Sequence, residues 1–214
     1  SKTSPPQTRR SSKATAYSLR AAAREFFGFT SPILLAVAAA ATVAARIWVG
    51  QWSWWDLALP VATLLIWPMQ EWLIHVFVLH FKPTRLGPLR LDPLAARKHR
   101  DHHQDPWHLP DVFIPVPVLL VAWPLVGLVW WAITPSWPLA LTGLAFYTSM
   151  ALVYEWTHYL IHSRYRPRSA FYERLWRHHR LHHCKNERYW YGVTMTGGDA
   201  LMGTDPAVEA VETS

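Results

Sequence analysis

The sequence predicts an all-α, four-helix integral membrane protein with a cytoplasmic histidine-rich helical cap. Three observations predict this fold. Four apolar stretches are each long enough to cross a bilayer, basic residues gather in the segments on one side of them, and all but one of the 12 histidines fall in short clusters. Of the 214 residues, 51% are hydrophobic and 14 are Trp, which is rich for a soluble chain. This length leaves room for one domain.

The apolar stretches cover about 31–49, 57–81, 112–134 and 137–161. Each approaches the roughly 20 residues that ~30 Å of hydrocarbon requires. The first is interrupted by Arg46, which we expect to snorkel to the outer interface. We therefore expect a basic cytoplasmic N-terminal tail over 1–24, a membrane-embedded domain over 25–205 and a C-terminal tail over 206–214. The first ten or so residues are expected to be disordered.

The basic residues predict the orientation of the spans. All but one of the 21 lysines and arginines precede the first stretch, lie between the second and third, or follow the fourth. With four spans these segments share one side, and the positive-inside rule places that side in the cytoplasm. The net charge of +7 then follows from topology, which excludes a nucleic-acid binder. Both termini should be cytoplasmic, and the bias toward Arg and Ala suggests a bacterial inner membrane by association.

The clustered histidines predict a metal centre. Two pairs close the second and fourth stretches, and two HxxHH boxes lie in the basic segments. The expected ligands are His75, His80, His99, His102, His103, His158, His162, His179, His182 and His183. Because ten imidazoles exceed what one ion needs, we expect a dinuclear, all-nitrogen site. His108 lies outside the pattern. His178 is expected to lie beside the metal ligands without binding a metal itself.

The spacing within the boxes has geometric meaning. Residues at i, i+3 and i+4 share a helix face, so one turn of an HxxHH box can offer two or three ligands. His75 and His80, five residues apart, diverge by about 140° on an ideal helix. These two either reach different metals or mark a distorted helix end.

Several neighbouring residues could support this centre. Glu71 and Glu155 each precede a box histidine by about one turn and could accept a hydrogen bond from its ring N–H, as could Asp199. Direct ligation of a metal by Glu71 or Glu155 is the alternative. Trp190 and Tyr191 could bound a substrate channel, in a segment that folds back over the site.

The chemistry expected of two metals in a membrane is oxygen activation. Two ferrous ions can together supply electrons to split O₂ and attack an unactivated C–H bond, and the membrane location fits a lipid substrate. Imidazole also suits Cu, Ni and Zn, so zinc could replace iron in a purified sample. A structural zinc site would need only four ligands, often thiolates. A non-catalytic metal-binding or transport protein remains an alternative, although a transporter should carry polar groups through its spans, whose middles are apolar here.

The order HxxxxH, HxxHH, HxxxH and HxxHH resembles the fatty acid hydroxylase/sterol desaturase superfamily of integral-membrane, histidine-box di-iron enzymes, from about residue 71 to 204. Within it, the phrases EWLIHVFVLHFKP, YEWTHYLIH and YWYGVTMTGGDALMGT are most similar to fatty acid 2-hydroxylases. This resemblance implies an O₂-dependent lipid hydroxylase that inserts oxygen at C2 of a fatty acid or acyl lipid. It implies no catalytic side chain beyond the metal ligands. Hydroxylation or desaturation of a carotenoid or sterol on the same site remains an alternative.

The sequence also departs from this family. Members often carry Arg after the first box histidine, where this chain has Val76. Eukaryotic acyl hydroxylases commonly carry a fused cytochrome b5 domain with an HPGG motif, which this sequence lacks. We therefore expect a separate electron donor, a ferredoxin or a cytochrome-type reductase, docking on the basic face. Carotenoid hydroxylases usually have one more residue between the two histidines of the third box than this chain has between His158 and His162. This spacing favours the acyl hydroxylases.

Overall fold

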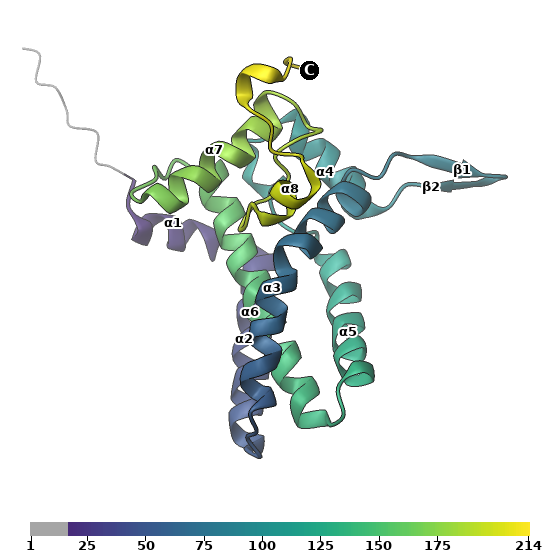
Figure 1. Ribbon diagram of the computed structural model, residues 1–214, viewed down its shortest axis with the longest axis vertical. Helices are drawn as coiled ribbons and strands as arrows, with labels where there is room; N and C mark the ends of the chain where they lie inside the picture. Colours follow the sequence, from purple (N-terminus) through teal and green to yellow (C-terminus); the bar gives the residue numbers. More distant parts are fainter. Residues whose placement is uncertain (1–16) are drawn as a thin grey trace, which may run out of the picture.

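The computed structural model describes residues 17–214 and contains four helices long and apolar enough to cross a membrane. They are α2 (Thr30–Val49), α3 (Trp55–Leu73) with its π-helical extension η1 (Ile74–Leu79), α5 (Val116–Ile133) and α6 (Trp137–His162). The spans run alongside one another in Figure 1. The prediction of an all-α protein with four spans is confirmed.

Helix α6 is the centre of the bundle, because α2, α3 and α5 all contact it. Its contact with α5 depends on Gly143. A Cβ atom at this position would lie 2.3 Å from the ring of Trp130. Without a side chain at residue 143, the indole of α5 lies directly on the backbone of α6, and the helices approach closely.

Most of the remaining helices gather at one end of the bundle (Figure 1). They are α4 (Leu94–Gln104), the 3₁₀ turns η2 (Leu109–Asp111) and η3 (Val208–Ala210), α7 (Ala170–Cys184) and α8 (Gly197–Met202). Ser169 caps α7, since its Oγ accepts a hydrogen bond from the Tyr172 N–H at 3.2 Å. A small antiparallel hairpin, β1 (Thr84–Leu86) with β2 (Leu89–Leu91), projects sideways. Strands of three residues are too short to give a period-2 signal, and the sequence analysis missed them.

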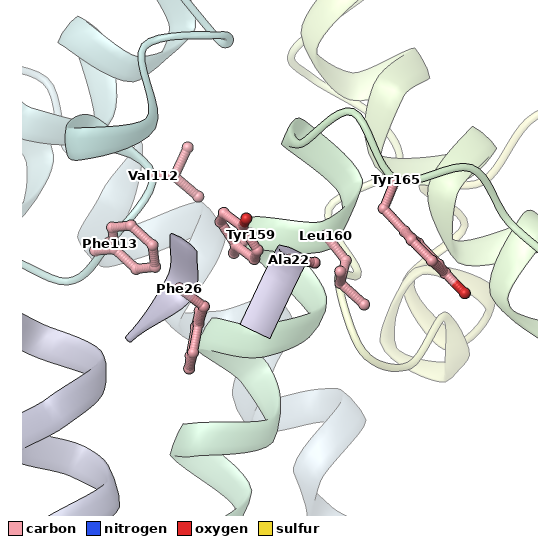
Figure 2. Packing of buried hydrophobic residues seen from close by; sticks show 7 residues of the cluster. All are labelled: Ala22, Phe26, Val112, Phe113, Tyr159, Leu160 and Tyr165. Carbon is pink, nitrogen blue, oxygen red and sulfur yellow. The ribbon is translucent and has the colours of Figure 1, made fainter. Parts of the chain in front are cut away.

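A short helix precedes the first membrane span. Helix α1 (Leu19–Phe26) falls mostly within the predicted tail over 1–24, yet Ala22 and Phe26 are buried. They join an aromatic cluster with Phe113 and Tyr159 (Figure 2). Eight residues give too short a window for a periodic signal, so the sequence did not indicate this helix. The disorder expected for the first ten residues concerns a segment outside the described residues.

The C-terminal segment also contacts the folded domain. Val211 is buried, and the Ser214 N–H donates to the Lys185 carbonyl at 2.9 Å. The predicted tail over 206–214 therefore lies against the end of α7.

Arg46 does not snorkel as predicted. Its side chain is buried, 2.6 Å from the Asp56 carboxylate, and its Nε donates to Thr142 Oγ1 at 2.5 Å. A buried cation needs a partner, and Asp56, in the first turn of α3, supplies one. This ion pair joins α2, α3 and α6 at the end of the bundle opposite α7.

Candidate metal centre

The ten histidines predicted as ligands converge in two groups of five. In each group, one nitrogen from every ring lies within 4.8 Å of the others. The first histidine group contains His75, His80, His99, His103 and His182, and the second histidine group contains His102, His158, His162, His179 and His183. The two groups are adjacent, since the rings of His103 and His183 are 4.2 Å apart between centroids.

The π-helix η1 explains why His75 and His80 share one group. The His80 N–H donates to the His75 carbonyl at 3.0 Å, a bond that spans five residues. A π-helix brings residues five apart much closer to one face than an α-helix, which would separate them by about 140°. Of the two possibilities in the sequence analysis, the distorted helix end is the one found.

Each HxxHH box contributes to both groups. Residues four apart stay together, as His99 and His103 do, while His102 between them faces the second group. The box on α7 is divided the same way, with His182 alone in the first group. The division follows from helix geometry, since residues i+3 and i+4 lie about 100° apart.

The first histidine group has more ring contacts than hydrogen bonds can explain. His99 Nε2 lies 3.1 Å from His75 Nε2, 3.2 Å from His80 Nε2 and 3.1 Å from His103 Nε2. A neutral imidazole donates from one nitrogen only, so one Nε2 atom cannot form three such bonds. Lone pairs pointing at a common centre repel one another unless a cation lies between them.

Backbone carbonyls fix the tautomer of two of these rings. His75 Nδ1–H donates to the Tyr191 carbonyl at 2.6 Å, and His182 Nδ1–H donates to the Tyr189 carbonyl at 2.8 Å. A proton on Nδ1 leaves Nε2 unprotonated and free to ligate. The support of this group therefore comes from backbone atoms of the segment 189–194.

The second histidine group contains buried nitrogens with no partner. In the described structure, both ring nitrogens of His102, His158 and His162 lack a hydrogen bond. Buried polar atoms are almost always paired, and one nitrogen of each of these rings belongs to the converging donors, as metal ligation would explain.

Burial keeps the cap histidines neutral. It lowers the pKa of His102 to about 4 and of His103 to about 3, and lowers the pKa values of His99, His179 and His182 well below the usual range. Neighbouring rings lower most of them further, because adjacent imidazoliums would repel. All five are therefore neutral near pH 7, as metal ligation requires.

The shortest separations between ring nitrogens are those expected of ligands that share one ion. With metal–nitrogen bonds of ~2.1 Å, neighbouring donors at right angles lie about 3.0 Å apart, and tetrahedral donors about 3.4 Å. The Nε2 atoms of His182 and His103 are 3.1 Å apart, and those of His183 and His179 are 3.0 Å apart. The donor nitrogens of each group lie within 4.8 Å of one another, and so the residues present fit two metal ions.

Glu71 and Glu155 do not bind a ring N–H as the sequence suggested. Glu71 Oε1 accepts from the backbone N–H groups of Val193 and, at 2.8 Å, Thr194. Glu155 Oε1 accepts from the Ile114 N–H at 2.7 Å. Both carboxylates hold backbone segments beside the histidines, and Glu71 anchors the segment whose carbonyls bind His75 and His182.

Asp199 organises the same segment and likewise contacts no proposed ligand. It accepts from the N–H groups of Tyr191 and Gly192 at 2.9 and 2.7 Å, and lies 3.0 Å from His178 Nε2. These bonds hold its pKa below the usual value, although burial opposes them. His178 is thus an Asp199 partner outside both groups. His108 is also outside them and bonds to Asp111 at 2.7 Å.

An apolar cavity of about 360 Å³ reaches the histidines from among the spans. His99 of the first group and His158 of the second both line it. Its walls come from α3, η1, α5 and α6, and include Ile74, Val78, Val118, Ala122, Val126 and Ala151. Trp190 and Tyr191, predicted to bound a channel, do not line this cavity. The Tyr191 ring instead packs on His75, 5.3 Å between centroids.

Sequence reasoning missed the backbone acceptors and the cavity wall. A carbonyl group has no residue-type signature, and Ala or Val in a span looks the same whether it faces lipid or a cavity. One usable signal was Gly198, where a Cβ would lie 2.3 Å from the Pro68 carbonyl oxygen. That contact places α8 directly on α3 and brings the segment 189–194 over the histidines.

Comparisons with known proteins agree with this geometry. The fatty acid hydroxylase family model matches residues 60–204. The chain is 29% identical over 148 residues to the dihydroceramide fatty acyl 2-hydroxylase FAH2 of Arabidopsis thaliana, covering 69% of this chain and 60% of that protein. It is 29% identical over 132 residues to the human fatty acid 2-hydroxylase, covering 60% and 34%. It is 30% identical to a β-carotene hydroxylase of Paracoccus sp. (strain PC1), covering 60% and 74%.

The fold has a counterpart among solved structures. Full-length scs7p, of which only the hydroxylase domain is visible, superposes with a TM-score of 0.70 at 20% identity, covering 86% of this chain and 68% of that one. The chain spans about 60% of the plant relative and about a third of the human one. Since the family model covers more than half of the residues, the chain belongs to the fatty acid hydroxylase family.

Proposed function

We propose that this protein is an O₂-dependent, non-haem di-iron monooxygenase that hydroxylates an acyl chain, at C2 of a fatty acid or acyl lipid. One observation carries the proposal. Two groups of five histidines lie at the end of an apolar cavity among membrane spans, and one histidine of each group lines that cavity. Alkyl substrate and metal centre would therefore meet at one place.

Iron is proposed from the combination of ligands and reaction class. All-imidazole sites accept iron but also copper, nickel or zinc, so zinc in a purified sample would not count against iron. When bound, two ferrous ions supply the redox chemistry that splits O₂ and oxidises a C–H bond. The protein supplies neutral ligands of fixed tautomer and a site shielded from water.

The cavity supports a long-chain substrate. Each methylene buried there contributes about 0.8 kcal/mol to binding. The end nearest the histidines is also lined by Lys98 and Asp111, which form an ion pair at 3.2 Å. Reaction at C2 requires the adjacent carbonyl to lie beside the metals. In this proposal Lys98, the cation at that end, receives the carbonyl or head group.

The proposed orientation places both termini and the histidines in the cytoplasm, on the positive-inside rule. Electrons come from a separate donor, a ferredoxin or a cytochrome-type reductase. A bacterial inner membrane stays a prediction, since the matched relatives come from a plant, mammals and a bacterium.

Product analysis with labelled substrates tests the reaction. The iron-loaded protein is given a chemical reductant, ¹⁸O₂ and long-chain acyl lipids, either unlabelled or deuterated at C2. The proposal predicts one ¹⁸O atom in the product and loss of one deuterium. Retention of both deuteriums would refute C2 as the position. Loss of two hydrogens without added oxygen would make the protein a desaturase.

Carotenoid hydroxylation is the second candidate. It is favoured by the Paracoccus relative, a β-carotene hydroxylase that this chain covers over 74% of its length. Supplying β-carotene in the same assay separates the candidates, because only a carotenoid hydroxylase would convert it in preference to the acyl lipid.

A further inference from the structure

A second hollow approaches the metal centre from outside the membrane spans. It has a volume of about 520 Å³ and is lined by Trp107, His162, Arg164, Arg166 and Arg180 among others. We call it the arginine hollow. His162 belongs to the second histidine group, and so this hollow and the apolar cavity reach the same centre through different residues.

The charge of the arginine hollow is not neutralised internally. Within the described part of the chain, no carboxylate lies within ion-pair distance of its three arginines. Glu25, the acidic residue in its lining, instead accepts a hydrogen bond from Tyr159 Oη at 2.7 Å. Arg164 and Arg166 are exposed. Three cations around one opening attract a negatively charged partner, and this attraction persists near the surface over about a Debye length, ~10 Å at 0.1 M salt.

An exposed aromatic ring connects this surface to the second histidine group. Trp107 is 49% exposed, and its ring centroid lies 5.9 Å from that of the buried His162. The guanidinium of Arg180 holds the indole in place, 4.4 Å from its centroid, and lies 4.0 Å from the ring of Trp176 on its own helix. A small anion would use the arginines but would have no need of an exposed indole against a buried histidine.

We propose that the arginine hollow is the docking site of an acidic one-electron carrier protein, with Trp107 as the contact through which electrons reach His162. This inference rests on the proposed function. Monooxygenation consumes one O₂, two electrons and two protons, giving one hydroxyl and one water. Two carrier molecules, each oxidised by one electron, supply the electrons. Complementary charge with a small contact area is typical of transient redox encounters.

Binding by metal-free protein in lipid nanodiscs tests the docking site without depending on turnover. The probes are an acidic plant-type ferredoxin and a soluble cytochrome b5, at about 0.1 M salt where distant charges are screened. Arg164→Glu/Arg166→Glu is compared with Arg85→Glu/Arg90→Glu, which makes the same charge change on the hairpin. Figure 1 shows that hairpin on the side of the molecule away from α1, whose Glu25 lines the hollow.

The proposal predicts that the hollow variant binds at least one carrier about tenfold more weakly and that the hairpin variant stays within about twofold. Unchanged thermal unfolding shows that each variant is folded. Equal weakening by both variants, no weakening by either, or no salt-sensitive binding of either carrier to the wild type would overturn it.

The role of Trp107 has its own readout. In iron-loaded protein at saturating carrier, Trp107→Leu should reoxidise pre-reduced carrier more slowly than His108→Leu, a neighbouring exposed residue. Wild-type transfer in Trp107→Leu would refute that role. If the wild type binds the carrier in the arginine hollow but forms no product with dithionite and O₂, the proposed function fails while the docking site stands.

Discussion

Replacing Asp199 tests how the metal centre is supported, because this fully buried carboxylate touches no proposed ligand. Its partners are the N–H groups of Tyr191 and Gly192, the Thr204 hydroxyl at 2.6 Å and His178 Nε2. The same segment supplies the two carbonyls that orient His75 and His182. Removing Asp199 should therefore disturb the first histidine group selectively.

The size of the effect follows from the partners lost. Asp199→Ala leaves four donors without their acceptor, and each of the three buried ones costs about 1–3 kcal/mol before water or relaxation compensates. We expect unfolding free energy to fall by roughly 3–5 kcal/mol, and by about half that in Asp199→Asn, which keeps one oxygen acceptor. Removing such an indirect support of a ligand costs about 10–100-fold in metal affinity. The loss should fall on one ion of two, since no hydrogen bond joins residues 189–194 to the second group within the described structure.

The assay is an anaerobic ferrous titration of the wild type, Asp199→Asn and Asp199→Ala, with bound iron counted at each step. His178→Ala is the matched control, because it removes one Asp199 partner and leaves the segment's backbone bonds intact. One ion weakened about 10–100-fold and the other unchanged would support the reasoning. Equal weakening of both ions, or unaltered affinity in Asp199→Ala, would refute it.

The remaining predictions concern ligation, substrate length and pH. His102→Ala should abolish turnover, since it removes a buried nitrogen ligand of the second histidine group. His108→Ala should keep most of the activity. An active His102→Ala protein would refute the ligand assignment. Ala151→Trp should fill part of the apolar cavity and shift the products toward shorter acyl chains. Leu128→Trp, on the exposed face of α5, should leave the product chain length unchanged. Unchanged chain lengths in both variants would mean that the cavity does not hold the substrate. The pKa of Asp199 is lower in the folded protein than the value of about 3.9 expected in the unfolded chain. The stability that the Asp199 carboxylate adds to the fold is therefore present above the unfolded pKa and is lost as pH falls through the folded pKa. The difference in unfolding free energy between metal-free wild type and Asp199→Asn should thus be constant above about pH 5 and shrink below about pH 4, and a difference that grows on acidification would contradict this.

The sequence predicted the spans and the identities of the converging histidines because both have strong local signatures. Twenty-residue apolar stretches are read from composition, and pairs such as His158 and His162 share a face by spacing alone. Their division into two groups was out of reach. It depends on the π-helical turn between His75 and His80, and nothing in the residues 74–79 distinguishes a π turn from an α turn.

The supports of the site could not be predicted because they are tertiary contacts. Glu71 was identified as relevant from its position near His75, but its actual partners, Val193 and Thr194, lie more than 120 residues away in sequence. Arg46 was misread for the same reason, since its partner Asp56 is visible only once α2 and α3 are packed. Local spacing identifies which residues take part, and the fold decides what each one binds.

Iron content and oxygenated product, measured on one sample, test the central claim most directly. Protein purified anaerobically with ferrous iron is assayed for iron per chain, then given reductant, O₂ and acyl lipid. The account predicts two iron ions per chain and a lipid heavier by one oxygen atom, and loss of one ion together with all product in His158→Ala/His162→Ala. A single tightly held ion in the wild type, with no oxygen consumed, would contradict it.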